Sequence, residues 1–177
     1  MHVIPREPRQ EARTAGRGWS GHRFASVALP IALSACAPGN SLNGSMEDLT
    51  SLSYSGVAVK LQNNSLVIQY QSFVDGGGNI PFELTYNTAG IPLDGGQILL
   101  LDAGTTAGLP RAIASRTVIG DNRTFSAIDR GTLTLATPVV VGQPANGSFF
   151  VVFSYQNDDT LGSGRTVYGD FEATVTK

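Results

Sequence analysis

Apolar and polar residues alternate along most of the chain after residue 48, which is typical of strands with one buried and one solvated face. The clearest cases are residues 80–86, where Ile, Phe, Leu and Tyr alternate with Pro, Glu and Thr, and residues 167–175. No helical amphipathic stretch competes with this pattern. About eight or nine strands are predicted, at residues 57–61, 66–73, 80–86, 97–102, 112–119, 124–128, 132–136, 148–156 and 167–175.

Gly, Asn and Asp separate these strands, because they adopt the backbone conformations that tight turns need. The expected turns are 63–64, 75–79, 94–96, 120–122, 145–147 and 162–164. Short strands with such turns predict an all-β domain over residues 48–177, an antiparallel β-sandwich of Ig-like or related type, with a barrel as the alternative. Strand 57–61 is expected to pair with 66–73.

Two features of the last strands refine this picture. The segment 148–155, SFFVVFSY, is apolar on both faces over its first half, which predicts a central strand. A Gly-x-Phe step occurs at 147–149 and again at 169–171. We interpret it as two sandwich strands that begin with the same short pattern, not as an internal repeat.

Composition fits one globular domain, since the 177 residues are 41% hydrophobic and include 21 Gly and 9 Pro. Five arginines and two glutamates give the first 35 residues a charge of +3, so the rest carries −5. The seven cations of that remainder are scattered rather than clustered. Without a basic patch to neutralise phosphates, nucleic acid is not expected as a partner.

The N-terminal segment has the pattern of a targeting signal. Its cationic part ends at Arg23, and residues 24–35 are apolar or small. A membrane-spanning helix needs about 20 apolar residues, so this run fits the apolar region of a signal peptide instead. We therefore expect residues 1–35 to be a signal peptide.

The four residues Leu33, Ser34, Ala35 and Cys36 resemble the lipobox of bacterial lipoproteins. The resemblance covers the leader only. It implies cleavage between Ala35 and Cys36, a diacylglyceryl thioether on the cysteine, and often an acyl group such as palmitate on the new amino terminus. Two or more acyl chains hold a protein stably to a membrane, whereas one binds only marginally. Ala37, where an aspartate would favour the inner membrane in enteric lipoproteins, implies the outer membrane, in its periplasmic or surface-facing leaflet.

Two other interpretations of Cys36 stay open: a small buried hydrophobe, and an intermolecular disulfide or free thiol in an exported protein. Residues 36–47 are rich in Gly, Asn and Ser and lack periodicity, so we expect the lipidated cysteine to be followed by a flexible tether.

Candidate catalytic groups are few. Both histidines, His2 and His22, lie in the predicted leader, and the only cysteine would carry lipid, which argues against catalysis by His-paired nucleophiles and against His-based zinc sites. Carboxylate pairs such as Asp102 with Asp129 or Glu83 with Asp170 could in principle serve glycoside hydrolysis. We expect most of these carboxylates to be solvated surface charges.

The loop residues Asn157, Asp158 and Asp159 are weak candidates for calcium ligands. Their spacing matches no EF-hand, and an Asx turn explains the same residues, so we expect no metal or other cofactor. The sequence predicts a lipid-anchored, non-catalytic binding or structural module of the bacterial envelope, with a protein or glycan partner. The alternative is an envelope enzyme that acts on glycan through a carboxylate pair.

Overall fold

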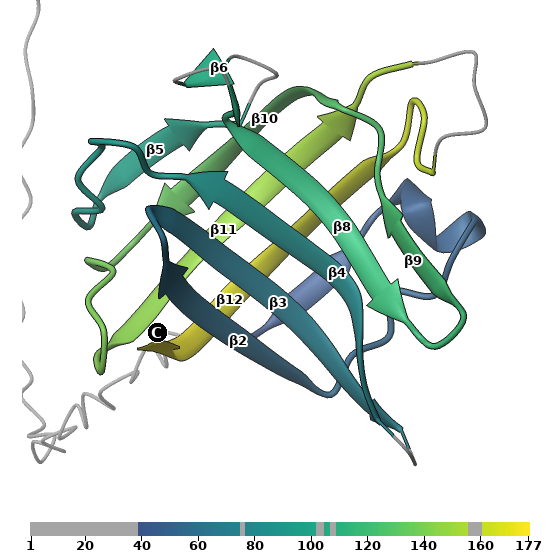
Figure 1. The fold of residues 1–177 in the computed structure, drawn as a ribbon, viewed down its shortest axis with the longest axis horizontal. Coiled ribbons are helices and arrows are strands. Elements are labelled where there is room, and N and C mark those ends of the chain that lie inside the picture. The colour runs from purple at the N-terminus through teal and green to yellow at the C-terminus, as the bar shows by residue number, and fades with distance from the viewer. Residues whose placement is uncertain (1–38, 75–76, 102–104, 107–108, 156–160) are drawn as a thin grey trace, which may run out of the picture. The chain divides into compact units, whose positions relative to one another are not determined.

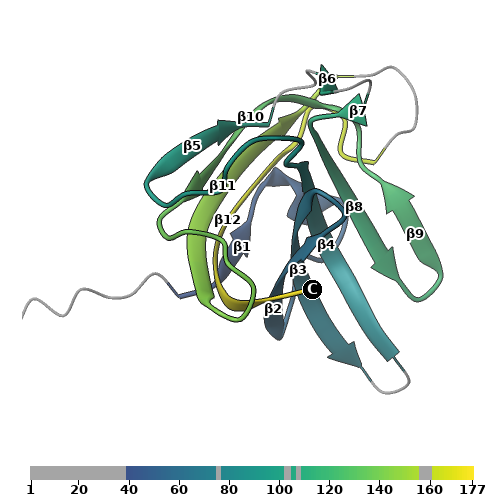
Figure 2. The same ribbon diagram turned by 60° about the vertical axis from the view of Figure 1, so that its left-hand side comes forward.

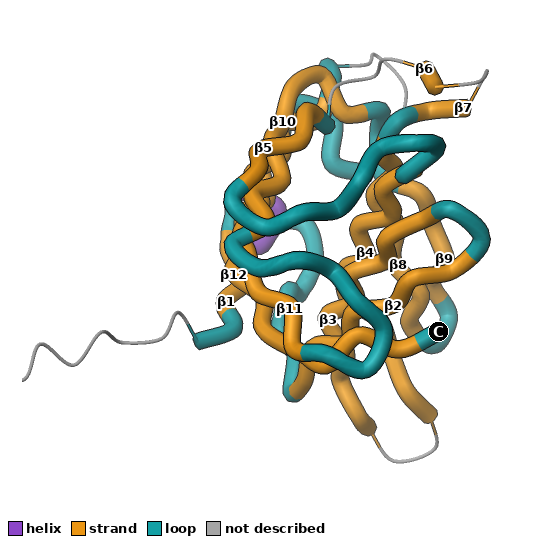
Figure 3. Tube along the Cα trace, turned by 90° about the vertical axis from the view of Figure 1, so that its left-hand side faces the viewer, coloured by secondary structure: helices purple, strands orange, loops and turns teal. Residues whose placement is uncertain are grey.

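Two layers of β-sheet pack face to face in the computed structural model, which describes residues 39–177 except 75–76, 102–104, 107–108 and 156–160. Figure 1 shows one layer in front of the other, and Figure 3 shows the layers edge-on. Along the strands, residues that face the other layer are buried and their neighbours are more exposed. The prediction of an all-β, sandwich-like domain is therefore confirmed.

Twelve strands and one turn of 3-10 helix lie in the described residues, more strands than predicted. The strands are β1 (Ser41–Asn43), β2 (Gly56–Gln62), β3 (Ser65–Val74), β4 (Gly77–Asn87), β5 (Gln97–Leu100), β6 (Thr105–Thr106), β7 (Leu109–Pro110), β8 (Ala112–Val118), β9 (Asp121–Thr124), β10 (Ile128–Leu135), β11 (Pro144–Phe153) and β12 (Thr166–Thr176). The 3-10 helix η1 is Ser45–Asp48. No helix of the described residues is long and apolar enough to cross a membrane.

The first layer has the strand order β5, β10, β11, β12, with β1 beside β12, and the second has the order β2, β3, β4, β8, β9. Strands β6 and β7 form a separate small ribbon. The position of β11 between β10 and β12 confirms its prediction as a central strand. The hairpin of β2 and β3 is also confirmed, and Asn63 and Asn64 at its turn both have positive φ.

The two layers are joined at one corner by a parallel pairing, in which Val175 lies opposite Val59 and Thr176 opposite Lys60. The other pairings of named strands are antiparallel. The predicted antiparallel sandwich therefore has one parallel pairing of named strands, at this corner. Strands β5 and β9 end the strand order without pairing with each other, so the sheet is not closed into a barrel.

Aromatic rings fill the space between the layers. Phe82 of β4 stacks on Phe149 of β11 with ring centroids 5.5 Å apart, and Phe125 stacks on Phe153 at 5.3 Å. Tyr70 is fully buried and donates its hydroxyl hydrogen bond to the carbonyl of Asp170 in the opposite layer, at 2.7 Å. Burial raises the pKa of Tyr70 above its ordinary value. These contacts hold the two layers together.

The Gly-x-Phe step has a structural meaning that the sequence did not show. In the ladder of β11 and β12, Gly147 lies opposite Phe171, and Phe149 lies opposite Gly169. A Cβ on Gly147 would lie 2.7 Å from the ring of Phe171, and one on Gly169 would lie 3.1 Å from the ring of Phe149. Each glycine leaves room for the ring of the other strand, a reciprocal version of aromatic packing over strand glycines.

The segment predicted as a tether is partly folded. Strand β1 pairs with β12, Leu42 is buried, and Met46 of η1 has no exposed surface. Figure 2 shows β1 on the same layer as β11 and β12. Leu42 and Met46 reach the core, although the apolar residues of this segment are spaced too irregularly to show a period. Among the described residues, the domain therefore begins about seven residues earlier than the predicted Asp48.

The predicted strand 124–128 is wrong. Thr124 ends β9 and Ile128 begins β10, and between them the chain passes from the second layer to the first. The N–H of Phe125 donates to the carbonyl of Ala114, and that of Ser126 donates to the carbonyl of Leu161, both at 2.9 Å. The apolar alternation here reflects burial of a crossing segment rather than of a strand.

The predicted turn at 145–147 is also wrong, because these residues lie inside β11. The turn lies just before them, where the N–H of Gln143 donates to the carbonyl of Val140 and Gly142 has a φ of 85°. Gly147 is needed for close packing, with the ring of Phe171 over it, and not for a positive φ.

Candidate functional site

Most of the residues predicted to carry chemistry lie outside the described part of the chain. This holds for Ala35 and Cys36 of the lipobox, for the calcium candidates at 157–159, and for Asp102. Among the described residues, no group of three or more His, Cys, Asp and Glu side chains could hold a metal ion.

The structure does not bring the carboxylates of Glu83 and Asp170 together. Each points outward from its strand, Glu83 from β4 in the second layer and Asp170 from β12 in the first. Glu83 accepts a hydrogen bond of 2.6 Å from the side chain of Gln69, and Asp170 accepts one of 2.7 Å from the hydroxyl of Ser41. These carboxylates therefore tie strands together and do not flank a common cleft.

The outer face of the first layer carries four large apolar side chains, which we call the outer apolar patch. Their exposed fractions are 66% for Ile98, 55% for Leu100, 42% for Phe150 and 48% for Tyr168. The strand register places most of them in one row, since consecutive cross-strand partners are Leu100, Thr132, Phe150 and Tyr168. With strands about 4.8 Å apart, the row is about 14 Å long.

Polar residues border most of the outer apolar patch, and the partly exposed Val152 adjoins it on the remaining side, between Arg130 and Thr166. The next row along the same face consists of Thr134, Ser148, Asp170 and Ser41 beside Ile98. Asn43 of β1 lies opposite Tyr168 and ends the apolar row. An apolar centre with a polar border is the usual anatomy of a protein-binding surface.

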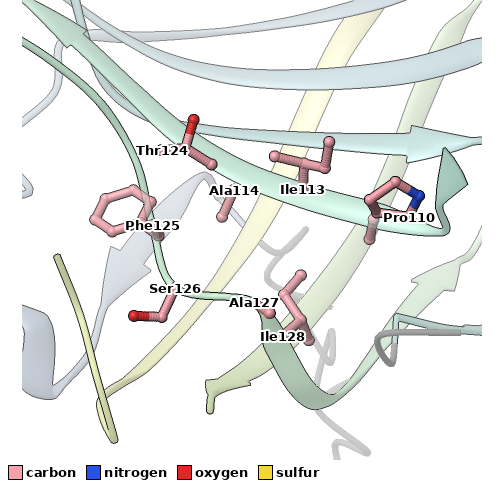
Figure 4. Close-up of a pocket in the computed structure, with 9 residues that line it drawn as sticks. Pro110, Ile113, Ala114, Thr124, Phe125, Ser126, Ala127 and Ile128 are labelled. Atoms are coloured by element: carbon pink, nitrogen blue, oxygen red, sulfur yellow. The ribbon is translucent and has the colours of Figure 1, made fainter. Parts of the chain in front are cut away.

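A second candidate is an apolar pocket of about 300 Å³ between β8 and the crossing segment 124–128 (Figure 4). Its walls are mostly apolar, and the larger side chains among them are Ile113, Phe125 and Ile128. The hydroxyl of Ser126 donates to the carbonyl of Leu161 at 3.3 Å. No titratable side chain lines the pocket in the described residues, so it offers an apolar surface but no general acid, base or charged nucleophile.

The strand pattern contained a signal for the outer apolar patch. Ile98, Phe150 and Tyr168 stand at positions where the alternation calls for polar residues. Sequence reasoning used Phe150 only to infer a central strand, and the register that aligns it with Leu100 and Tyr168 depends on pairings between distant segments.

Comparisons of this chain with family models, curated proteins and solved structures find no match.

Proposed function

We propose that this protein is a lipid-anchored envelope protein whose β-sandwich is a non-catalytic binding module, and that the outer apolar patch binds a protein partner. The observation that carries the proposal is the row of Leu100, Phe150 and Tyr168 on a sheet face whose other outward positions are mostly polar. Solvation of such contiguous apolar surface is unfavourable, and burial against a partner removes it.

The lipobox resemblance gives the proposal its location. Cys36 precedes Gly39, the first described residue, by three positions, and an extended chain spans at most about 3.6 Å per residue. A lipid on Cys36 would thus hold the domain close to the membrane, with the Cα of Gly39 within about 11 Å of the Cα of Cys36. Strand β1, which borders the outer apolar patch at Asn43, follows almost at once. The favoured partner is therefore a protein at the same membrane surface.

The test is site-specific crosslinking in native cells. A photoreactive amino acid in place of Phe150 should yield a discrete crosslinked protein, because this side chain lies at the centre of the row. The matched control is the same amino acid in place of Thr117, which is exposed on β8 of the other layer. Equal crosslinking from both positions, or none from position 150, would overturn the proposal.

A second variant separates binding from folding. With a photoreactive amino acid at position 132, the double change Phe150→Ser and Tyr168→Ser should abolish the crosslink while the melting temperature stays within a few degrees of the parent, because both side chains are nearly half exposed and lie outside the core. A crosslink that survives this change would place the partner elsewhere.

A further inference from the structure

A second pocket, with different chemistry, opens beside the hairpin of β8 and β9. Its volume is about 280 Å³. Its polar lining comes from the segment after η1, from the ends of β3 and β4 that form a hairpin, and from β8: Ser51, Ser53, Ser72, Asn79 and Arg116. The other side chains that line it in the described structure are apolar, and none is a carboxylate.

Arg116 is unusual among the lining residues because it occupies an inward-facing position of β8. Only 8% of its surface is exposed. Its Nε and Nη1 atoms are buried and have no hydrogen-bond partner among the described residues. Nε lies 3.2 Å from a carboxylate oxygen of Asp121, an ion pair without hydrogen-bond geometry. Burial of these two nitrogens without hydrogen bonds is unfavourable.

Within the hairpin of β8 and β9, the positive charges outnumber the negative ones beside Arg116. Arg116 lies directly opposite Arg123 in the ladder of β8 and β9, and like charges at such positions repel. Asp121 is the carboxylate between them, and Arg123 binds both of its oxygens through Nε and Nη2. This hydrogen bonding, together with the charges of both arginines, lowers the pKa of Asp121. Two guanidinium groups thus share one ionised carboxylate.

Two of the other polar side chains, Asn79 and Ser51, use an oxygen as acceptor and keep hydrogen-bond donors. The Oδ1 atom of Asn79 accepts from the N–H of Ile119 at 2.9 Å, which leaves the amide NH2 as the group that faces other partners. The hydroxyl of Ser51 accepts from the N–H of Ser53 at 3.2 Å and keeps its own proton for donation. A guanidinium, an amide and serine hydroxyls in one pocket are complementary to an oxyanion.

We propose that this pocket binds the oxyanion group of a small ligand, a carboxylate or a phosphate, with Arg116 as the main donor. The ligand supplies the second negative charge that the two arginines lack, and its oxygens satisfy the buried guanidinium hydrogens. The size of the pocket suits a single acidic sugar or a phosphorylated group. The site is separate from the outer apolar patch, since Arg116 points inward from the second layer, and it does not depend on the function proposed for that patch.

The test is ligand-dependent thermal stability of the full chain at constant ionic strength. Glucuronate and acetate probe the carboxylate source, inorganic phosphate and a sugar phosphate probe the phosphate source, and chloride is the reference. A ligand that binds only the folded state raises the melting temperature in a saturable way. We expect such a rise with one of the two oxyanion classes, and the class that gives it identifies the source. No rise with any of them relative to chloride would overturn the proposal.

Matched variants assign the effect to the pocket. Arg116→Gln should weaken the binding about tenfold or more, as expected for loss of charged hydrogen bonds. Arg130→Gln removes the same charge from an exposed position of β10 in the other layer and should leave the binding unchanged. If Arg116→Gln does not fold, Arg116→Lys and Ser72→Ala decide the question, since both should weaken binding relative to Arg130→Gln. Equal affinity in all variants would contradict the assignment.

Discussion

Phe153 shows how much a single side chain contributes to this domain. Its ring is 1% exposed and stacks on Phe125. Phe153→Ala should therefore lower the free energy of unfolding by about 3–5 kcal/mol, the usual range for truncating a buried aromatic residue. Phe150→Ala, three positions earlier on the outer face of the same strand, should cost about 1 kcal/mol or less. Denaturant unfolding of both variants measures the difference, and similar losses would contradict the inward assignment of Phe153.

At the scale of residues, the alternation alone identified which side of a strand is buried for Phe82, Leu84 and Tyr86. It could not identify the role of Gly147, whose space is taken by a ring from a partner strand. The burial of Arg116 was also not predicted. It shares the phase of Ala112 and Ala114, and a charged residue in an apolar phase is a signal that sequence reasoning did not use.

At the scale of elements, the segment of β1 and η1 is the main addition to the predicted fold. Leu42 and Met46 bury their side chains, and hydrogen bonds link Ser41 to Asp170 and Ser45 to Thr166. A protein that begins at Ser45 lacks β1, whereas one that begins at Gly39 keeps it. We expect the shorter form to be less stable by about 2 kcal/mol or more, because burial of Leu42 alone contributes about that amount.

Thermal and denaturant unfolding of the two truncated forms would test this expectation. Both contain the complete set of strands from β2 to β12, so the comparison isolates β1. Equal stability would mean that β1 adds nothing to the core and that the tether extends through residue 44. A shorter form that remains folded but less stable would show that β1 is an added edge strand rather than part of the folding core.

Hairpins and distant pairings differ in how well the sequence predicts them. The hairpins β2–β3 and β3–β4 follow from local turn residues, such as Asn63 and Asn64. The parallel contact of Val175 with Val59 joins residues more than a hundred positions apart, and no local pattern encodes it. Both candidate binding surfaces depend on contacts between segments that are distant in the sequence. The outer apolar patch needs a register across four strands, and the pocket beside Arg116 needs three separate segments.

At the scale of the whole molecule, the function that we propose divides roles between the binding surfaces and the lipobox. The described domain offers an apolar patch on one layer and a basic pocket on the other. Among the described residues there is no amphipathic helix of the kind that binds a membrane surface. In the function that we propose, attachment to a membrane rests on the lipid that the resemblance implies for Cys36, and the domain is available for its partners.

Cys36→Ala tests this division of roles. The expected result is a protein that takes no label from an alkyne fatty acid and leaves the membrane fraction or accumulates as a precursor, because the lipobox resemblance implies that this thiol accepts the lipid. Ser34→Ala is the matched control, since it keeps a small residue before the cysteine and should retain the label. The intact mass of the parent protein should correspond to residues 36–177 plus acyl chains. A mature protein that begins before Cys36, or one without acyl mass at that residue, would rule out the lipid anchor and leave the domain as an exported protein that finds the membrane only through its partner.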